Sequence, residues 1–423
     1  MKIRLRYIFV AALLFRLIIS PLANHPDVGN HIDWGIRFFE YGANGFYAPE
    51  SNVWSFTWPN QPPGTILIFA LTRKVYELIF SLFWGLNNLL PAFPSRLIFL
   101  IQDHLYPILL KAPAIISDLG IAYLIYKFLE KYKYKNAARF GAILYLVNPV
   151  IWYNSSVWGQ TDATINFFVL MGLWFLLDKK PVYSSLSIAI SLYIKISLAI
   201  FLPIIAILFI KQKFSGKQIA ISALFPVVLF TILTLPFSYP GEPFSWIINL
   251  YREKVLTNQL QVVTANAFNL WAGLTGIKEQ SHIQLLGPLT YRAWGYILFA
   301  ISYVPLLYRA WTKPNFSTIV WIFSLTAFSS FMLLTNMHER YLYPLFPYFT
   351  ILASMNMKLL PVYFGVSGIN LLNMYHLWWV PRIEFVNEIF AYRNQILPRI
   401  LGFVNFAFYL KTVLIYTRSR GEV

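Results

Sequence analysis

The sequence contains no cysteine, and only 12% of its 423 residues are charged. Without cysteine the chain can form neither a disulfide bond nor a thiolate metal site. Typical soluble domains carry about 25% charged residues, so the low charge argues against a soluble protein. Apolar residues make up 58% of the chain. They recur in runs close to the roughly 20 residues that a helix needs to cross a bilayer.

Several catalytic signatures are also missing from the sequence. There is no P-loop, no G-x-G-x-x-G fingerprint and no H-E-x-x-H zinc helix. There is no Asp-x-Asp pair either, which removes the usual metal–nucleotide clamp of nucleotide-sugar transferases. No soluble domain is predicted that could hold a nucleotide donor. We therefore predict that the protein uses no metal and no cofactor.

The apolar runs predict an all-α, polytopic transmembrane helical bundle that forms one domain over residues 1–423. Helices are expected because a helix satisfies its own backbone hydrogen bonds in lipid. We predict about twelve spans (11–13), at residues 7–22, 107–129, 137–153, 164–178, 183–194, 197–210, 218–236, 291–309, 316–334, 341–356, 359–376 and 396–416. The first run follows three basic residues, as a signal peptide would. It lacks a small-x-small cleavage site, so we interpret it as an uncleaved helix.

The net charge of +17 would suggest nucleic acid as a partner of a soluble protein, but here it indicates topology. If the N-terminus is inside, 19 of the 34 Lys and Arg residues fall in short cytoplasmic pieces. These pieces are Lys2–Arg6, Lys127–Arg139, Lys179–Lys180, Lys211–Lys217, Arg309–Lys313, Lys358 and Lys411–Arg420. This asymmetry follows the positive-inside rule. We predict a multi-pass plasma-membrane protein with both termini cytoplasmic and no nucleic-acid partner.

Two long outer segments follow from this topology, residues 21–106 and residues 237–290. Within the first, Pro62–Tyr106 is apolar but is interrupted by Arg73 and by several prolines. A single crossing there would place Lys131–Lys135 outside, against the charge rule. The stretch therefore either crosses twice or lies along the outer interface as amphipathic helices, and we favour interfacial helices.

Carboxylates stand close to the end of the first predicted span. The first outer loop contains Asp27 and Asp33 among aromatic residues, including Trp34. Aromatic side chains are common at headgroup level, so the loop has a purely interfacial interpretation. A carboxylate in such a partly desolvated position is less expected there. Its pKa could be raised toward that of a general base.

A second polar cluster, Asn154–Ala163, follows the third predicted span. In structural terms Gly159 would allow a turn and Asp162 would cap the next helix. That interpretation leaves Trp158 and Gln160 unexplained. The pair suggests a functional role for this short connection.

Cationic residues occur at two further outer positions. Lys195 stands alone in an apolar stretch, where it is either functional or snorkels to the surface from a tight hairpin. The sequence TNMHERYLYP places His338, Glu339 and Arg340 at another helix end. Arg with His is suited to binding phosphate, whereas an Arg–Glu pair could simply close the loop.

Two asparagines and a buried-charge pair complete the set of polar candidates. Asn266 and Asn269, in the long outer segment, could line a sugar-binding surface. Arg16 and Asp118 lie inside predicted spans, where pairing would neutralise both. All the other polar clusters fall on the outer side of the predicted topology. This coincidence predicts an outer site that handles a lipid-borne phosphate.

These motifs, in this order, resemble the GT-C class of polyprenyl-phosphate-sugar glycosyltransferases. They are most similar to the bacterial and archaeal proteins that resemble the second mannosyltransferase of GPI-anchor assembly. The matching stretches are Asp27–Trp34, Gly45–Tyr47, Gln61–Gly64, Lys111–Leu119, Asn148–Ala163, Asn266–Gly276 and Met337–Pro344. Gln61 departs from the Tyr-Pro-Pro that is more usual in the family.

The resemblance implies a GT-C fold with an outer active site and an inverting mechanism. It implies a dolichyl- or undecaprenyl-phosphate hexose as donor, with mannose as the hexose. By position, Asp27 matches the general base of such enzymes, ahead of Asp33. His338 and Arg340 match residues that hold the donor phosphate, assisted by Lys195. Trp34, Trp158, Gln160, Asp162, Asn266, Asn269 and Glu339 are then expected to shape the cavity and bind substrate.

The sequence leaves the acceptor open among a glycan, a glycolipid and a protein side chain. Membrane lipids are the other expected partners. Three other classes of protein also stay open. They are a ligase or polymerase of lipid-linked glycans, a transporter or flippase for a lipid or small solute, and a purely structural membrane protein. Transporters commonly carry paired internal repeats, and no such repeat is evident here.

Overall fold

The computed structural model describes residues 4–48, 59–256, 260–391 and 396–419. Within them the chain is almost entirely helical, and the only strands described are β1 (Leu285–Leu286) and β2 (Leu289–Thr290), which pair antiparallel. This agrees with the predicted all-α class. Many helices begin with proline at the first or second position, as in α2 and α9, where proline costs no intrahelical hydrogen bond.

The helices of the first half end at or before Lys211. They are α1 (Leu5–Ile19), α2 (Pro26–Gly45), α3 (Pro63–Leu89), α4 (Arg96–Leu100), α5 (Tyr106–Lys131), α6 (Lys135–Val147), α7 (Pro149–Trp152), α8 (Asp162–Leu177), α9 (Pro181–Ile194) and α10 (Leu202–Lys211). The predicted span 137–153 is divided between α6 and α7. The break comes at Asn148, whose side chain accepts a hydrogen bond from the backbone N–H of Val150 and so caps α7.

The helices of the second half follow Ser215. They are α11 (Gly216–Ser238), α12 (Pro243–Leu250), α13 (Leu270–Thr275), α14 (Tyr291–Thr312), α15 (Phe316–Leu333), α16 (Leu345–Met355), α17 (Leu360–Tyr375), α18 (Glu384–Ala391) and α19 (Ile396–Ser419). Short π-helical or 3-10 turns, such as Tyr153–Trp158 and Ile196–Phe201, connect several of them.

Four described segments are long and apolar enough to cross a membrane. They are Arg96–Lys131, Gly216–Ser238, Phe316–Leu333 and Ile396–Ser419. Four further apolar helices have 10–17 residues, and at 1.5 Å per residue they are shorter than the roughly 30 Å hydrocarbon core. The structure thus supports membrane-spanning helices, while the number of twelve spans in a GT-C arrangement stays a prediction.

The exposed face of α11 is apolar. Leu224, Phe225, Val228 and Ile232 are all about half exposed, although they are large and apolar. An apolar helix face this extensive is unfavourable in water but not in lipid. The exposed side chains of α11 therefore suit contact with lipid.

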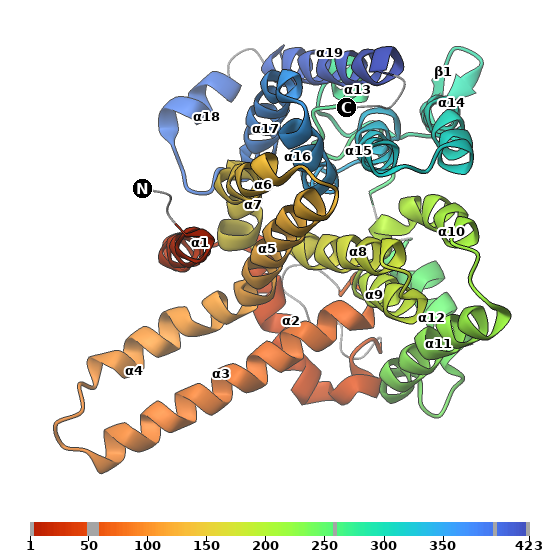
Figure 1. Cartoon of the computed structure of the whole chain (residues 1–423). Helices are drawn as coiled ribbons and strands as arrows, with labels where there is room; N and C mark the ends of the chain where they lie inside the picture. Colours follow the sequence, from red (N-terminus) through yellow and green to blue (C-terminus); the bar gives the residue numbers. More distant parts are fainter. Residues whose placement is uncertain (1–3, 49–58, 257–259, 392–395, 420–423) are drawn as a thin grey trace.

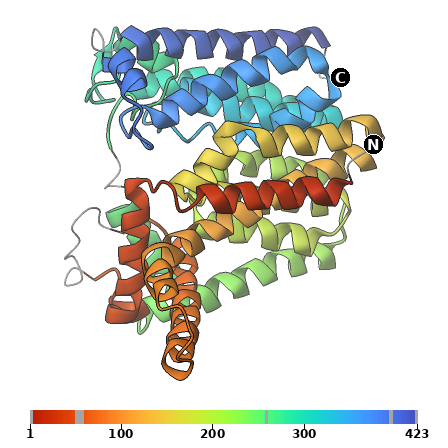
Figure 2. The same cartoon turned by 90° about the vertical axis from the view of Figure 1, so that its left-hand side faces the viewer.

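Several helices run side by side along one direction. Figure 2 shows α1, α17 and α19 roughly parallel in this view, with the N- and C-termini on the same side of the molecule. Helix α2 lies across that direction at the opposite end of α1 (Figure 2). Both termini therefore lie away from α2.

Helices α3 and α4 form a hairpin that projects from the helical body. Figure 1 looks down the axis of α1, whereas α3 and α4 lie in the plane of the picture. Ser95 donates a hydrogen bond to the Asn87 side chain across the turn at 2.9 Å. The hairpin therefore lies across the direction of α1. The placement of these helices along the outer interface stays a prediction.

A buried ion pair holds α1 against the body. The Nε of Arg16 donates to an Asp118 carboxylate oxygen at 3.1 Å, and both side chains are fully buried. Ser155 and Tyr343 donate to the same carboxylate at 2.6 and 2.8 Å. The pairing predicted from the sequence is confirmed. The network joins α1, α5 and the segments that lead into the candidate site.

Candidate functional site

A cavity of about 600 Å³ lies where stretches distant in sequence meet. Seven of the predicted site residues line it, namely Asp27, Trp34, Gln160, Asp162, Lys195, His338 and Arg340. They come from α2, the start of α8 and the connection before it, the end of α9 and the segment after α15. Four of the polar clusters that the sequence singled out therefore surround a single cavity, while the cluster that contains Asn266 and Asn269 does not reach it.

Asp27 stands in the first turn of α2. Its backbone N–H donates to Nδ1 of His25, the residue before the helix, at 3.1 Å. One of its carboxylate oxygens accepts from Trp158 Nε1 at 2.9 Å and from Gln160 Nε2 at 2.5 Å. The Trp-x-Gln pair thus has a geometric explanation, because both side chains orient the Asp27 carboxylate.

The protonation of Asp27 differs from the expectation. Burial is the largest single effect and opposes ionisation, but the Arg340 charge and several smaller effects, including the hydrogen bond from Trp158, together outweigh it, and the pKa of Asp27 is lowered. The sequence-based expectation of a raised pKa is therefore wrong, because a single sequence does not show that Arg340 lies near Asp27. Asp27 is ionised at neutral pH and can accept a proton. A phosphate bound to Arg340 would weaken this attraction and raise the pKa of Asp27.

His25 packs against the aromatic residues beside Asp27. Its ring stacks on Trp158 at a centroid distance of 4.1 Å and contacts Trp378 edge-on at 4.3 Å. Burial lowers the pKa of His25 to about 3, although Asp27 acts in the opposite direction. His25 is therefore a neutral packing and capping residue.

The turn before α8 requires a glycine. Gly159 has φ +72°, and a Cβ there would approach the Lys111 side chain to 3.1 Å. The prediction that Gly159 allows a turn here is confirmed. Asp162 does not cap α8 as expected, because its two oxygens accept from Lys195 and Asn154 instead.

A cluster of two cations and one carboxylate forms one wall of the cavity. Nζ of Lys195 donates to Asp162 at 2.9 Å, and Nε of Arg340 lies 3.8 Å from the other Asp162 oxygen. The Lys195 side chain is only 9% exposed, so it does not snorkel to the surface. The carboxylate holds both cations beside the cavity.

Both cations retain hydrogen-bonding capacity toward the cavity. A lysine ammonium has three donors, and one hydrogen bond of Lys195, to Asp162, is described. Nε of Arg340 is buried and donates to no described group. A buried donor without a partner is unfavourable. An anionic ligand such as phosphate would satisfy these donors, and guanidinium–phosphate hydrogen bonds are among the stronger ones.

His338 and Glu339 adjoin Arg340. Burial lowers the pKa of His338 to about 3, and the charges of Arg340 and Lys195 act in the same direction. Burial raises the pKa of Glu339 to about 7, against the effect of Arg340, which lies 3.3 Å away. The positive charge beside the cavity therefore comes from Arg340 and Lys195. His338 is a neutral hydrogen-bonding group there.

Five predicted site residues do not line the cavity. Trp158 and Glu339 contact lining residues, Asp27 and Arg340 respectively, and the other three are held elsewhere. Asp33 is paired with Arg37 one helical turn further on, at 3.0 Å. Asn269 caps α13 and donates to the backbone oxygen of Phe331. Asn266 hydrogen-bonds to His376 through its side chain. The last two have structural explanations in place of a sugar-binding surface.

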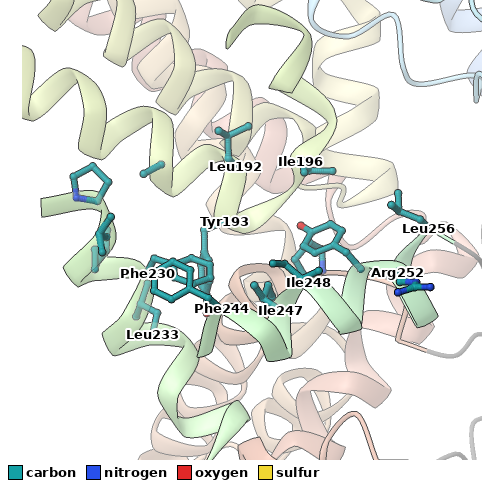
Figure 3. A pocket seen from close by; sticks show the side chains of 16 residues that line it. Leu192, Tyr193, Ile196, Phe230, Leu233, Phe244, Ile247, Ile248, Arg252 and Leu256 are labelled. Carbon is teal, nitrogen blue, oxygen red and sulfur yellow. The ribbon is translucent and has the colours of Figure 1, made fainter. Parts of the chain in front are cut away.

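An apolar groove of about 740 Å³ adjoins the cavity. It runs between α9, α11 and α12, where Phe230, Leu233 and Phe244 lie at one end and Arg252 and Leu256 at the other (Figure 3). Pro62, Ile196 and Leu256 line both spaces. Ile196 follows Lys195 directly, so the groove reaches the cationic wall. Helices α3 and α9 approach each other closely beside this junction. A Cβ at Gly64 on α3 would lie 2.5 Å from the backbone oxygen of Tyr193 on α9.

Sequence reasoning missed several residues that line the cavity, namely Asn30, His31, Gln61 and Trp378. For two of them a signal existed. Asn30 and His31 follow Asp27 by three and four residues, the spacing that places side chains on one helix face. Gln61 and Trp378 lie in irregular segments, where no periodic pattern indicates direction.

The fold and cavity together define a helical protein with segments long and apolar enough to span a membrane and with a polar cavity that suits an anion. Within the described ranges, no group of three or more His, Asp or Glu residues could hold a metal ion. The sequence matches no protein-family model and no curated protein. Function therefore has to be argued from the cavity.

Proposed function

We propose that the protein is an inverting glycosyltransferase that moves a hexose from a polyprenyl-phosphate donor to an acceptor hydroxyl. One observation carries the proposal. An oriented, ionised carboxylate, Asp27, shares a cavity with the cations Arg340 and Lys195, and an apolar groove reaches that cavity. Mannose as the hexose, a GT-C fold and an outer active site rest on the family resemblance.

The reaction assigns a role to each wall of the cavity. Asp27 takes the proton of the acceptor hydroxyl while that oxygen attacks the anomeric carbon. The bond between the anomeric carbon and the phosphate oxygen breaks, and the polyprenyl phosphate leaves with the electron pair. Arg340 and Lys195 stabilise the negative charge that grows on the leaving group. Removing one such donor commonly costs about 10²–10³-fold in rate.

The groove supports a lipid-borne donor over a soluble one. Its labelled lining is apolar apart from Arg252 and the hydroxyl of Tyr193 (Figure 3). A polyprenyl chain that enters the groove from the bilayer passes from one apolar environment to another, so the groove can hold it without exposing it to water. The phosphate of such a lipid would reach the cationic wall beside Ile196. A nucleotide-linked sugar would leave the groove unfilled.

The direct test uses purified protein and a labelled polyprenyl-phosphate hexose in lipid nanodiscs, with mannose and glucose compared. We expect release of polyprenyl phosphate and transfer of the label to an added glycan or glycolipid fraction. Movement of intact donor across a vesicle membrane without its consumption would indicate a flippase instead. Transfer of a whole oligosaccharide but not of a single hexose would indicate a ligase.

A further inference from the structure

Helix α2 presents three neutral side chains to the cavity beside Asp27. Asn30, His31 and Trp34 all line it, and they follow Asp27 by three, four and seven residues. This spacing places the four side chains along one face of α2. The face is separate from the Lys195–Asp162–Arg340 wall, which other elements supply.

His31 is buried, yet its ring nitrogens lack protein partners among the described residues. Nδ1 is inaccessible and unpaired, and no hydrogen bond of Nε2 to the described chain occurs. The ring is fixed by stacking on Phe69 at a centroid distance of 4.3 Å. A buried polar group without a partner is costly. Since Nδ1 is inaccessible, the nitrogen that a ligand in the cavity can pair with is Nε2.

His31 is also neutral in this position. Burial lowers the pKa of His31 to about 4, and the charges of Arg340 and Lys195 contribute, against the effect of Asp27. A neutral imidazole has one donor and one acceptor. It therefore matches a hydroxyl group, which can accept one hydrogen bond and donate another.

Amide side chains extend this neutral surface. Asn30 and Gln61 line the same cavity, and within the described residues neither side chain makes a hydrogen bond. Each amide offers two donors and an acceptor oxygen. Trp34 adds a flat apolar ring that is 3% exposed. Hydroxyl-matching groups next to an aromatic face suit a sugar ring better than they suit a charged or purely apolar ligand.

We propose that His31, together with Asn30 and Gln61, binds a neutral sugar acceptor and presents one of its hydroxyls to Asp27. His31 then determines acceptor specificity, and the substrate class on this side of the cavity is an uncharged carbohydrate. This inference rests on the proposed glycosyltransferase function. It excludes a protein side chain as the acceptor and leaves the neutral sugar of a glycan or a glycolipid.

The sharpest variant is His31→Phe, which keeps an aromatic ring to stack on Phe69 but removes both nitrogens. Methyl α-mannoside serves as the probe acceptor, and methyl glucuronide serves as its anionic counterpart. For the wild type we expect saturable transfer to the mannoside and at least tenfold less to the glucuronide. In His31→Phe the acceptor KM rises about tenfold or more, while the dissociation constant of the donor stays unchanged.

Two further variants separate hydrogen bonding from packing. His31→Gln supplies a donor and an acceptor again, and we expect it to recover part of the acceptor affinity. His104→Phe is the matched control, because His104 is an exposed histidine outside the cavity. Its acceptor KM is expected to equal that of the wild type.

Three results would overturn the acceptor assignment. They are an unchanged acceptor KM in His31→Phe, a donor dissociation constant that rises as much as the acceptor KM, and wild-type transfer to the glucuronide alone or to neither sugar. Donor consumption by the wild type in any of these cases would still support the glycosyltransferase. Absence of donor consumption under all conditions would instead reject the proposed function itself.

Discussion

At the scale of single residues, two carboxylates six positions apart on α2 have opposite surroundings. Asp27 accepts hydrogen bonds from Trp158 and Gln160 within the cavity, whereas Asp33 is paired with Arg37 outside it. Sequence alone ranked Asp27 first only by resemblance. The geometry supplies a physical reason, because of the two carboxylates only Asp27 lines the cavity.

The matched pair Asp27→Asn and Asp33→Asn tests this difference. The first keeps the size of the side chain but removes the proton acceptor, so kcat should fall by about 10²–10⁴-fold, the usual contribution of a general base. The second should stay within a factor of about two of the wild type. Both are measured as hexose transfer at saturating donor. A near-normal rate in Asp27→Asn would mean that another group takes the proton.

Glu339 predicts a pH dependence of donor binding. Because burial raises the pKa of Glu339 to about 7, the group is neutral below that pH and anionic above it. The anion competes with the donor phosphate for Arg340, 3.3 Å away. Donor affinity should therefore weaken as the pH rises from about 6 to 8. Equilibrium binding of labelled donor across this range measures the effect.

Glu339→Gln is the control for this titration. The amide cannot ionise, so we expect the donor dissociation constant of the variant to be nearly flat over the same range and close to the wild-type value at pH 6. A pH dependence that survives in Glu339→Gln would assign the titration to His338, whose pKa a bound phosphate would raise.

The candidate site was predictable in part, and for physical reasons. Lys195 was conspicuous because an isolated charge in apolar surroundings is costly, and Arg340 because it stands beside His338 in a pair suited to phosphate. The contact between Gln160 and Asp27 could not be read from a single sequence, since it joins residues 133 positions apart. Asn266 and Asn269 show the opposite case. In a single sequence, an asparagine that caps a helix or closes a loop cannot be distinguished from one that binds sugar.

At the scale of structural elements, the corner between α1 and α2 positions Asp27. Nζ of Lys111, on α5, donates to the backbone oxygens of Ser20 and Ala23 and to the side chain of Asn24, at 2.6 to 2.8 Å. Its side chain is fully buried. The Lys111 ammonium therefore satisfies three acceptors in the irregular connection between α1 and α2.

Lys111→Met should destabilise this corner. The variant fills similar space but leaves buried acceptors unpaired, at about 1–3 kcal/mol for each lost partner. We expect a lower thermal unfolding midpoint in detergent and a lower kcat, because the segment leads directly to His25 and Asp27. Lys127→Met, at a partly exposed position on the same helix, is the control and should change neither. An unfolding midpoint equal to that of the wild type would show that the corner is held by other contacts.

At the scale of the whole molecule, the general class was predictable, and the detailed boundaries were less so. Long apolar runs gave the positions of most helices, because burial in lipid or in the bundle demands them. Breaks such as Asn148, between α6 and α7, depend on local capping that periodicity does not reveal. The direction of α3 and α4 relative to α1 (Figure 1) depends on tertiary packing. The sequence pattern of Pro62–Tyr106 therefore allows two arrangements, two crossings of the membrane or interfacial helices.

The absence of cysteine makes the topology directly testable. Both termini lie on the same side in Figure 2. The loop around Lys278 is joined through Gln280 to Val263, and Ala265, two residues further on, pairs with His338. Single-cysteine variants Ser419→Cys and Lys278→Cys can therefore be labelled in intact cells with a membrane-impermeant maleimide. We expect labelling of Lys278→Cys alone. Equal labelling of both variants, with permeabilised cells as the reference, would contradict the predicted topology.

The groove between α9, α11 and α12 has a kinetic consequence. A substrate that reaches the reaction centre sideways, from among neighbouring lipids, is diluted by those lipids and not by the surrounding water. The turnover rate should then follow the mole fraction of donor in the bilayer. Adding inert phospholipid at constant donor molarity would slow the enzyme, and doubling the aqueous volume would leave its rate unchanged.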